Sequence, residues 1–484
     1  MKASGGAEQS LFHRGRTQAM DLASFVCRAS WEDLSRDARS ALKVRVLDSI
    51  GCAYGATGAV PIRMLRRHIA EFGGRPLCTL IGGGRTSPDR AALYNGALVR
   101  YLDYNDSYLA KGETCHPSDN LGAVLAAAEY AGICGKDLLA ALAVAYQVQC
   151  RLSDAAPLRD RGFDHVTQGV IAAAAGAGKA LSLDAGSLAN ALAIAATANN
   201  ALRVTRTGEL SHWKGLAAPN AASNGLHAAF LAKSGITGPA GAFEGPKGWV
   251  GVVSAPFDIE WEAEDLERVT RTILKKYNAE IHSQSAIEGL IGMMEAENFT
   301  GRQISRLRVD IFDVAFLIIG GGAEGDKTVV RTKEEADHSL PYILAVAALD
   351  GKVTPAQYEP GRILREDVQA LLRRVEVVPD PVFSARFPAE HACRLTVALK
   401  DGQILSREMS DYEGFHTRPM TWERAEAKFR EVAGRALDPG PADAVVQAVS
   451  DMEHLTAREF TSLLPNPLSG GSGPEPRSGP AGPT

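Results

Sequence analysis

Residues 100–120 read RYLDYNDSYLAKGETCHPSDN, a polar stretch between two segments with the apolar spacing of helices. Upstream, Ser87 and Pro88 open a helix in the order of cap residue and first-turn proline, and this helix is expected to end near Tyr101. Downstream, Pro117 fits the first position of the second helix. The stretch therefore predicts a helical fold in which one loop is rich in groups that bind or transfer protons.

The loop gives its histidine a special position. If Pro117 begins the second helix, His116 is the N-cap and Asp119 lies in the first turn, where the helix dipole favours an anion. Free backbone N–H groups at a helix start suit a substrate carboxylate and disfavour a charged imidazole. A neutral His116 could then act as a general base. The plainer alternative stays open, because caps and turns use these same residue types.

Helical periodicity dominates the first half of the chain. Between residues 119 and 233 alanine is dense, and glycine or proline falls mostly between periodic segments. Such small residues let helices pack closely in an all-helical core. The expected helices cover residues 121–131, 138–152, 169–181, 187–198 and 217–233.

The pattern changes after about residue 280. Alternation of β-branched residues predicts strands within residues 305–319, 375–378 and 393–409, and Asp401-Gly402 fits a hairpin turn between two strand-like runs. Helical stretches alternate with these strands, which indicates a smaller α+β domain. Those helices are expected at residues 283–297, 339–349 and 365–373.

The expected fold class is mainly α, with a large all-helical domain and an inserted smaller α+β lid domain. The lid is interpreted as an insertion because helical periodicity returns between Trp422 and Phe460. The last residues are almost all Pro, Gly and Ser, a composition typical of disorder. The expected divisions are a flexible N-terminus at residues 1–17, the large helical domain at 18–278, the lid domain at 279–420, C-terminal helices that return to the helical domain at 421–464, and a disordered tail at 465–484.

Composition limits the function classes. The 484 residues carry a formal net charge of -5, so we expect neither nucleic acid nor a membrane surface as a partner. The seven cysteines are widely spaced without a C-x-x-C pair, which favours a reduced, cytoplasmic protein over a zinc or iron–sulfur protein. Neither a signal peptide nor a membrane-length apolar segment is recognisable.

One glycine motif could be mistaken for a nucleotide site. Gly320, Gly322 and Gly325 spell G-x-G-x-x-G directly after an apolar run that ends at Ile319. The helix that a dinucleotide fingerprint requires does not follow, because the next residues, DKTVVRTKEE, have no apolar face. Dinucleotide binding is therefore a remote alternative.

Polar clusters from distant parts of the chain point to one kind of ligand. Lys214 precedes an alanine-rich helix, where the dipole disfavours a cation unless an anion binds there. Further cations and imidazoles lie at residues 275–284 (KKYNAEIHSQ) and at Asp337-His338. Together with the first loop they supply what a site for a polycarboxylate requires.

These clusters resemble the MmgE/PrpD family, whose members include 2-methylcitrate dehydratase, cis-aconitate decarboxylase and iminodisuccinate epimerase. The resemblance covers nearly the whole chain between its two tails, and the first loop looks most like the 2-methylcitrate dehydratase version. The segments that carry it, in order, are LDYNDSYLA at residues 102–110, HPSDN at 116–120, WKG at 213–215, AAPNA at 217–221, AEIHSQ at 279–284 and ADHSLPY at 336–342.

The resemblance implies a homodimer with an active site between the helical domain and the lid, and catalysis without metal or organic cofactor. The family's site positions match five residues here, and two departures stand out: a serine replaces the usual threonine, and the loop before the histidine is longer, which argues against decarboxylation. The matching residues are Asp103, Ser107, His116, Lys214 and Lys275; the family's lysine at this last point varies, so Lys275 and Lys276 are both candidates for it.

The function expected from these residues is dehydration of a β-hydroxy polycarboxylate such as 2-methylcitrate. His116 is assigned proton transfer, and Lys214 is assigned the substrate carboxylate and the enediolate that forms from it. The alternatives are an epimerase or a decarboxylase of a related substrate and, more remotely, a helical scaffold without catalysis. The remaining site residues are Asp103, Asn105, Asp106 and Ser107, which orient the histidine and the leaving hydroxyl, and Lys275, Lys276, His282, Gln284 and His338, which bind the substrate.

Overall fold

The computed structural model of the chain describes residues 17–322 and 325–467. The expected flexible N-terminus and disordered tail therefore lie largely outside the described residues. Of the tail, residues 465–467 are described, and the Pro465 carbonyl accepts a hydrogen bond of 2.8 Å from the Tyr54 hydroxyl.

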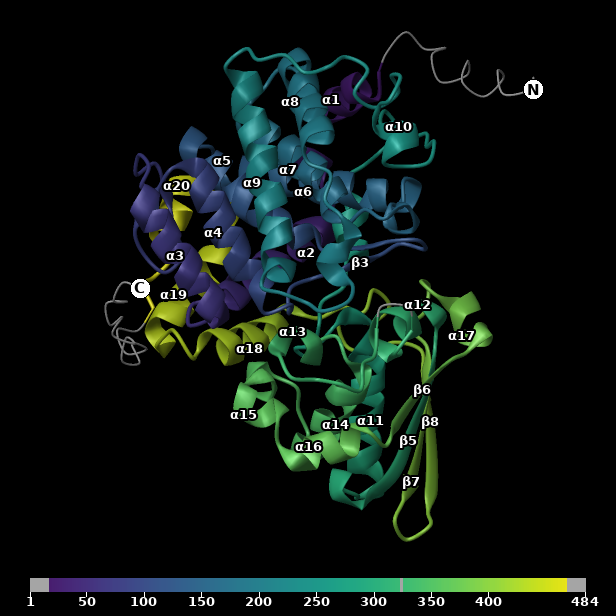
Figure 1. Cartoon of the computed structure of the whole chain (residues 1–484). Helices are drawn as coiled ribbons and strands as arrows, with labels where there is room; N and C mark the ends of the chain where they lie inside the picture. Colours follow the sequence, from purple (N-terminus) through teal and green to yellow (C-terminus); the bar gives the residue numbers. More distant parts are fainter. Residues whose placement is uncertain (1–16, 323–324, 468–484) are drawn as a thin grey trace, which may run out of the picture.

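Helices make up the upper part of the molecule in Figure 1. Their starts and ends agree with the sequence to within a few residues, because the N-cap, proline and glycine signals act locally. No described helix is both long and apolar enough to cross a bilayer. The helices of this part are α1 (Gln18–Arg28), α2 (Arg36–Ala56), α3 (Val60–Phe72), α4 (Pro88–Tyr101), α5 (Leu121–Ala131), α6 (Gly135–Ala155), α7 (Val166–Ala180), α8 (Ala185–Ala198), α9 (Trp213–Lys233) and the short α10 (Trp249–Val252).

Small residues bring α4, α5 and α9 close together. A Cβ atom on Gly122 of α5 would lie 2.7 Å from the backbone nitrogen of Gly96 on α4. On its other side, a Cβ atom on Gly96 would lie 3.3 Å from the side chain of Pro219 on α9. Larger residues here would force the helices apart. The C-terminus of α4 and the N-terminus of α9 are thereby held close, and these two ends carry the polar cluster described below.

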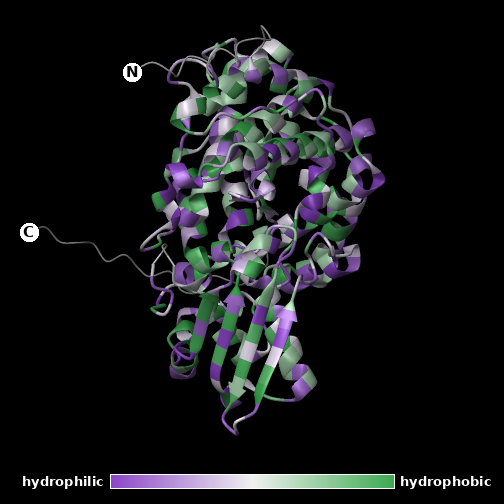
Figure 2. Ribbon diagram, turned by 90° about the vertical axis from the view of Figure 1, so that its right-hand side faces the viewer, coloured by the Kyte–Doolittle hydropathy of each residue, from purple (hydrophilic) through white to green (hydrophobic). Residues whose placement is uncertain are grey.

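The lower part contains a four-stranded sheet in the order β6-β5-β7-β8, in which β5 and β6 are parallel and the other pairs antiparallel. The sheet is built from β5 (Ile304–Ile311), β6 (Val375–Pro379), β7 (Cys393–Leu399) and β8 (Ile404–Met409). Hydrophobic and hydrophilic residues alternate along the strands (Figure 2), and in β7 every second residue is buried. The expected hairpin at Asp401-Gly402 joins β7 to β8.

Helices cover one face of this sheet, with α11 against β7 and β8, and α14 against β6. The helix and sheet side chains form a hydrophobic core separate from that of the upper part. The helices of the lower part are α11 (Gln284–Glu297), α12 (Asp313–Ala315), α13 (Lys333–Ala336), α14 (Leu340–Asp350), α15 (Pro360–Ile363), α16 (Glu366–Leu372) and α17 (Pro381–Arg386).

The prediction of a strand within residues 305–319 is correct only for the first half of this run. Residues 305–319 were expected to be strand-like, but the strand ends at Ile311, and α12 and a π-helical turn (Phe316–Gly320) follow. Phe312, Ala315 and Ile319 are fully buried at helical spacing, so burial on one helix face outweighs the β propensity of this run. The G-x-G-x-x-G motif therefore follows a helical turn, and within the described residues the next helix begins at Lys333. This arrangement lacks the strand and the helix of a dinucleotide fingerprint.

The last helices are α18 (Trp422–Ala433), α19 (Pro439–Ser450) and α20 (Ala457–Ser462). They pack against the upper part: α18 and α19 lie on α2, and α20 lies on α5. In Figure 1, α18 runs along the boundary between the two parts. The chain thus leaves the helical part near residue 272 and returns to it near residue 421, and the exact limits of the domains stay predictions.

Candidate active site

Asp103 lies where α4 ends, in a backbone conformation that is unusual for its residue type. Its φ is 53°, in the left-handed region, which costs free energy for a residue other than glycine. Three cations hold its carboxylate in place. Arg100 lies 2.5 Å from Oδ1 and the Lys275 ammonium lies 2.8 Å from the same oxygen, while the Lys214 ammonium lies 3.4 Å from Oδ2.

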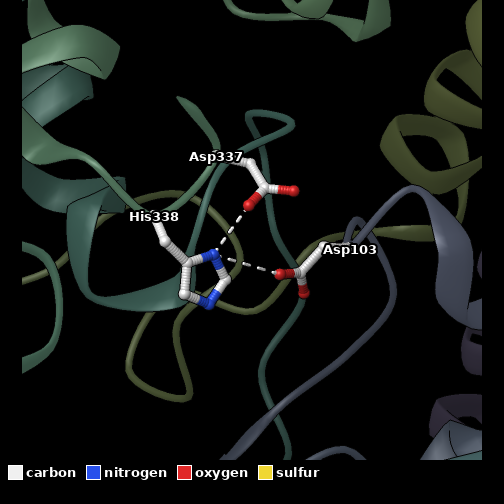
Figure 3. Close-up of side chains that lie close together, drawn as sticks. All are labelled: Asp103, Asp337 and His338. Carbon is white, nitrogen blue, oxygen red and sulfur yellow. Dashed lines mark hydrogen bonds and ion pairs between the residues drawn. The ribbon is translucent and has the colours of Figure 1, made fainter. Parts of the chain in front are cut away.

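Lys214 joins this loop to the lower part of the molecule. It is the second residue of α9, and its ammonium lies 2.6 Å from Oδ1 of Asp337 and 2.8 Å from Nδ1 of His338. Figure 3 shows Asp103, Asp337 and His338 converging, with Nδ1 of His338 facing both carboxylates at 2.7 and 3.7 Å. Asp337 and His338 lie between α13 and α14, so the cluster spans both parts of the chain.

The charges in this cluster stabilise one another against burial. Burial opposes ionisation of Asp103, but Arg100 and Lys275 outweigh it and hold the pKa of this carboxyl well below its usual range. The pKa of the Asp337 carboxyl is likewise lowered, because Lys214 and Lys333 outweigh burial. Burial lowers the pKa of Lys214 despite its two carboxylate partners. The cluster thus consists of buried ion pairs. Its cations are already desolvated, so binding of an additional anion does not require the desolvation of new cations.

A pocket opens beside the cluster. It leaves room for about one water molecule, so it is closed to a larger ligand in this conformation. Three cations face it, of which Arg100 and Lys333 were not expected from the sequence. The residues that line the pocket are Arg100, Tyr101, Asp103, Lys214, Gly215, Lys333 and Glu334.

His116 is not among the residues that line this pocket, and it is held by a hairpin that the sequence did not predict. β3 (Tyr108–Leu109) pairs with β4 (Thr114–Cys115), and this register places Ser107 opposite His116. Nδ1 of His116 lies 2.7 Å from the backbone oxygen of Asp106 and 3.0 Å from the Ser107 hydroxyl. Because a carbonyl only accepts, Nδ1 carries the proton and donates it, which leaves Nε2 as the basic nitrogen.

The protonation state of His116 suits a base. Burial, together with the charges of Arg100 and Lys275, holds the pKa of His116 well below its usual range. The imidazole is therefore neutral at pH 7, as its place as N-cap of the short 3₁₀ helix Pro117–Asn120 predicted.

A second imidazole, His165, was missed by the sequence analysis. Its ring centroid lies 5.4 Å from that of His116, in an edge-to-face arrangement. Burial and the charges of Arg206 and Arg100 hold its pKa well below the usual range, so this imidazole is also neutral. His165 directly precedes α7, as His116 precedes a helix, and this shared position is the signal that could have revealed it.

Two expected site residues, Asp106 and Asn105, hold the loop in place through hydrogen bonds. The Asp106 carboxylate accepts hydrogen bonds from the Ser118 backbone N–H (3.1 Å) and from the Tyr146 hydroxyl (2.7 Å). The Asn105 amide donates to the Ser118 hydroxyl (2.9 Å) and to Asp119 (3.1 Å). Both side chains are buried and support the loop through these hydrogen bonds, while Oδ1 of Asn105 has no hydrogen-bond partner among the described residues.

The structure does not bring three expected residues into the cluster. Lys276 is paired with Glu288 and Glu413 at 2.8 and 3.1 Å. The side-chain amide of Gln284 is hydrogen-bonded to the backbone of Tyr277. The Tyr277 N–H donates to Oε1 of Gln284, and the Tyr277 carbonyl accepts from Nε2 of Gln284.

His282, the third of these, lies among aromatic rings in the core of the lower part. Its ring stands 5.6 Å from that of Phe312 and 6.0 Å from that of Phe387. Its Nδ1 lies 2.7 Å from the Glu280 carboxylate. Helix periodicity and charge could not reveal the aromatic partners, because Phe312 and Phe387 come from distant parts of the chain, whereas Glu280 is only two residues from His282.

Helix spacing could have revealed two further cations. Arg100 and Asp103 are three residues apart at the end of α4, and Lys333 and Asp337 are four apart along and just beyond α13. Such pairs face each other on one side of a helix. Asp337 itself stands beside the expected His338, yet only the contact with Lys214 identifies it as a site residue.

Asp119 gives a pH-dependent prediction. Burial raises the pKa of this carboxyl to about 7, although Arg100 counteracts it. An unfolded aspartate has a pKa of about 3.9, so the folded chain holds this proton more tightly. The protonated Asp119 carboxyl therefore makes its full contribution to the free energy of unfolding below about pH 4, and this contribution is lost as the pH rises to about 7.

Replacing Asp119 with asparagine removes this titration and keeps an acceptor for the Asn105 amide. The melting temperature of the variant relative to the parent should therefore rise between about pH 5 and about pH 8. Thermal scans of both proteins across this range measure it. A difference in melting temperature that does not change with pH would contradict the raised pKa.

Two family models match the chain in succession. The MmgE/PrpD N-terminal domain matches residues 20–262, and the MmgE/PrpD C-terminal domain matches residues 277–454. The boundary between the matches falls in the segment that carries Lys275, where the chain passes from the helical part to the lower part.

Relatives of known name are similar over most of their length. The 2-methylcitrate dehydratase of Escherichia coli (strain K12) is 27% identical over 433 residues, which cover 83% of this chain and 86% of that protein. The 2-methylcitrate dehydratase of Cupriavidus necator is 28% identical over 478 residues, 92% of this chain and 96% of that protein. The cis-aconitate decarboxylase of Mus musculus is 26% identical over 459 residues, 89% of each. All three names describe lyases.

Proposed function

Because this chain belongs to the MmgE/PrpD family, we propose that it is a lyase that dehydrates a β-hydroxy polycarboxylate, with 2-methylcitrate as substrate and 2-methyl-cis-aconitate as product. The observation that carries the proposal is the ammonium of Lys214, buried between Asp103, Asp337 and His338 at the start of α9. A buried cation at the positive end of a helix dipole suits an anionic ligand. The 2-methylcitrate dehydratases among its relatives support this choice of substrate.

The reaction removes a proton α to a carboxylate and a hydroxyl group from the neighbouring carbon. Neutral His116 takes the proton at Nε2, while its Nδ1–H stays bonded to the Asp106 carbonyl. Negative charge then develops on the substrate carboxylate, and Lys214 and Arg100, which both face the pocket, stabilise it. Loss of the hydroxyl group needs a proton donor. Burial and the neighbouring ammonium of Lys214 lower the pKa of His338, so this imidazole is neutral, and we assign the donation to the Lys214 ammonium, whose pKa burial also lowers.

The proposed reaction is independent of metal ions. Asp103, Asp337 and His338 present ligand atoms within 4.8 Å of one another, a set that could hold a cation. The Lys214 ammonium already lies among these atoms, 2.6 Å from Asp337 and 2.8 Å from His338. A metal ion at this point would meet the repulsion of a buried ammonium.

Substrate entry requires the two parts of the molecule to separate. A citrate-like molecule is far larger than the single water for which the pocket has room. Asp337, His338 and Lys333 come from the lower part, whereas Arg100, Asp103 and Lys214 come from the helical part. Separation of these two groups opens the pocket, and closure over the substrate assembles the site and excludes water.

A second candidate function is epimerisation at an α-carbon. It needs the same enediolate but two opposed proton carriers and no leaving group. The observation that favours it is the pair of buried neutral imidazoles, His116 and His165, with ring centroids 5.4 Å apart.

Ultraviolet absorbance tests the dehydration directly. The protein, treated with a chelator and then freed of it, is mixed with 2-methylcitrate and separately with citrate. We expect the absorbance of the conjugated alkene to rise, and to rise faster with 2-methylcitrate than with citrate. The rate should be the same when the chelator treatment is omitted. No signal from either compound would refute dehydration, and exchange of an α-proton with deuterium oxide under the same conditions would then favour the epimerase.

A further inference from the structure

Lys333 is a cation that no step of the proposed reaction uses. It is the first residue of α13 in the lower part, and its side chain is 18% exposed. Its ammonium donates to the Tyr101 carbonyl at the end of α4 (2.9 Å) and to Oδ2 of Asp337 (2.7 Å). It also lies 4.9 Å from the centroid of the Tyr101 ring. Lys333 therefore joins the two parts of the molecule at the pocket.

The ammonium of Lys333 has capacity for another partner. An ammonium has three donors, and Tyr101 and Asp337 take two of them in this structure. Lys333 lines the pocket together with Arg100 and Lys214, and the carboxylates on the pocket wall are Asp103 and Glu334. Burial disfavours the charge on Lys333, yet Asp337 and Tyr101 outweigh it and raise its pKa, so the side chain stays cationic.

We propose that Lys333 is a substrate-binding residue, which contacts a carboxylate of the polycarboxylate through its third N–H. This inference rests on the proposed function and deepens it, because it assigns a carboxylate subsite to the mouth of the pocket. The substrate then bridges Arg100 and Lys214 of the helical part to Lys333 of the lower part. A compound with several carboxylates can form this bridge, and a monocarboxylate cannot, which makes the number of carboxylates a determinant of specificity.

A purely structural role for Lys333 makes a different prediction. In that case it would only hold Asp337, and its loss would disturb Lys214 and slow the chemical step. A contact made equally with substrate and transition state weakens binding and leaves kcat nearly unchanged. Measurements of Kd and kcat therefore distinguish a substrate-binding role of Lys333 from a purely structural one.

The test uses calorimetric binding of tricarballylate, a tricarboxylate without a hydroxyl group that cannot be dehydrated. The variants are Lys333→Met, Lys333→Arg and, as a matched control, Lys352→Met, whose lysine is exposed in the same part of the chain. We expect Lys333→Met to raise Kd by about 10- to 100-fold, because hydrogen bonds between charged groups are strong. Lys333→Arg should keep Kd within about fivefold of the parent, because the charge remains. The control should match the parent.

Turnover of 2-methylcitrate by the same variants supplies the second readout. We expect Lys333→Met to raise KM by a similar factor and to change kcat by less than about threefold. An unchanged Kd for tricarballylate, or a loss confined to kcat, would overturn the inference. If the unaltered protein binds tricarballylate but dehydrates neither 2-methylcitrate nor citrate, the proposed function is refuted and the inference stands. If the unaltered protein does not bind tricarballylate, the inference is overturned.

Discussion

Replacing Lys214 with methionine is expected to lower kcat/KM for 2-methylcitrate by about 10³-fold or more, with kcat carrying most of the loss. The ammonium is the cation that lies between Asp103 and Asp337 at the start of α9, where charge develops during the reaction. Methionine keeps the length and volume of the side chain and removes its charge. The rate of conjugated-alkene formation measures the effect.

The fold should survive this change, because other cations remain beside both carboxylates. Asp103 keeps Arg100 and Lys275, and Asp337 keeps Lys333. The control is Lys233→Met, which removes an exposed lysine from the far end of the same helix. Circular dichroism should be the same for parent and both variants. Turnover of Lys214→Met within about tenfold of the parent would remove Lys214 from the mechanism.

Replacing His116 with glutamine is expected to lower kcat by about 10²- to 10⁴-fold, with a smaller effect on KM. Glutamine can still donate a hydrogen bond to the Asp106 carbonyl, but it cannot accept the α-proton. The variant should also lose exchange of the substrate's α-proton with deuterium oxide, which mass spectrometry measures. This second readout separates loss of the base from loss of the proton donor.

His227→Gln is the matched control, because His227 is an exposed histidine of α9 that lies outside the cluster. It should leave both kcat and proton exchange at the level of the parent. If His116→Gln keeps proton exchange and loses only dehydration, the base is another imidazole, and His165, next to His116, is the first to test.

Local signals in the sequence were sufficient for most of the helices. The proline at position 88 and the glycine at position 132 mark helix ends because proline fixes φ near the first turn and glycine adopts a left-handed φ, here 71°, at little cost. The hairpin at Asp401-Gly402 follows from the same local chemistry. The run after Ile311 was misjudged because its residues favour a strand locally, while contacts with the rest of the lower part bury them on one helix face.

The sequence also supplied the family resemblance, which both family models confirm. It predicted a neutral His116 from the position at a helix start. In the structure the pKa of His116 is lowered by burial and by the charges of Arg100 and Lys275, which the fold brings near the imidazole. The sequence did not distinguish Lys275 from Lys276, which are neighbours with the same side chain. The fold turns Lys275 towards Asp103 and Lys276 towards Glu288, because the two side chains leave the backbone in different directions.

The sequence by itself thus determined the helices, the loop that carries Asp103 and His116, and the type of chemistry that these residues support. Only the tertiary structure decided which charges meet. Arg100, Lys214 and Lys333 are separated by more than a hundred residues from one to the next. They face one pocket because α4 and α9 pack closely and because Lys333 of α13 donates a hydrogen bond to the Tyr101 carbonyl at the end of α4. The physical reason is that caps and turns depend on neighbours in the chain, whereas the energy of a buried ion pair depends on distances that only the packed fold fixes.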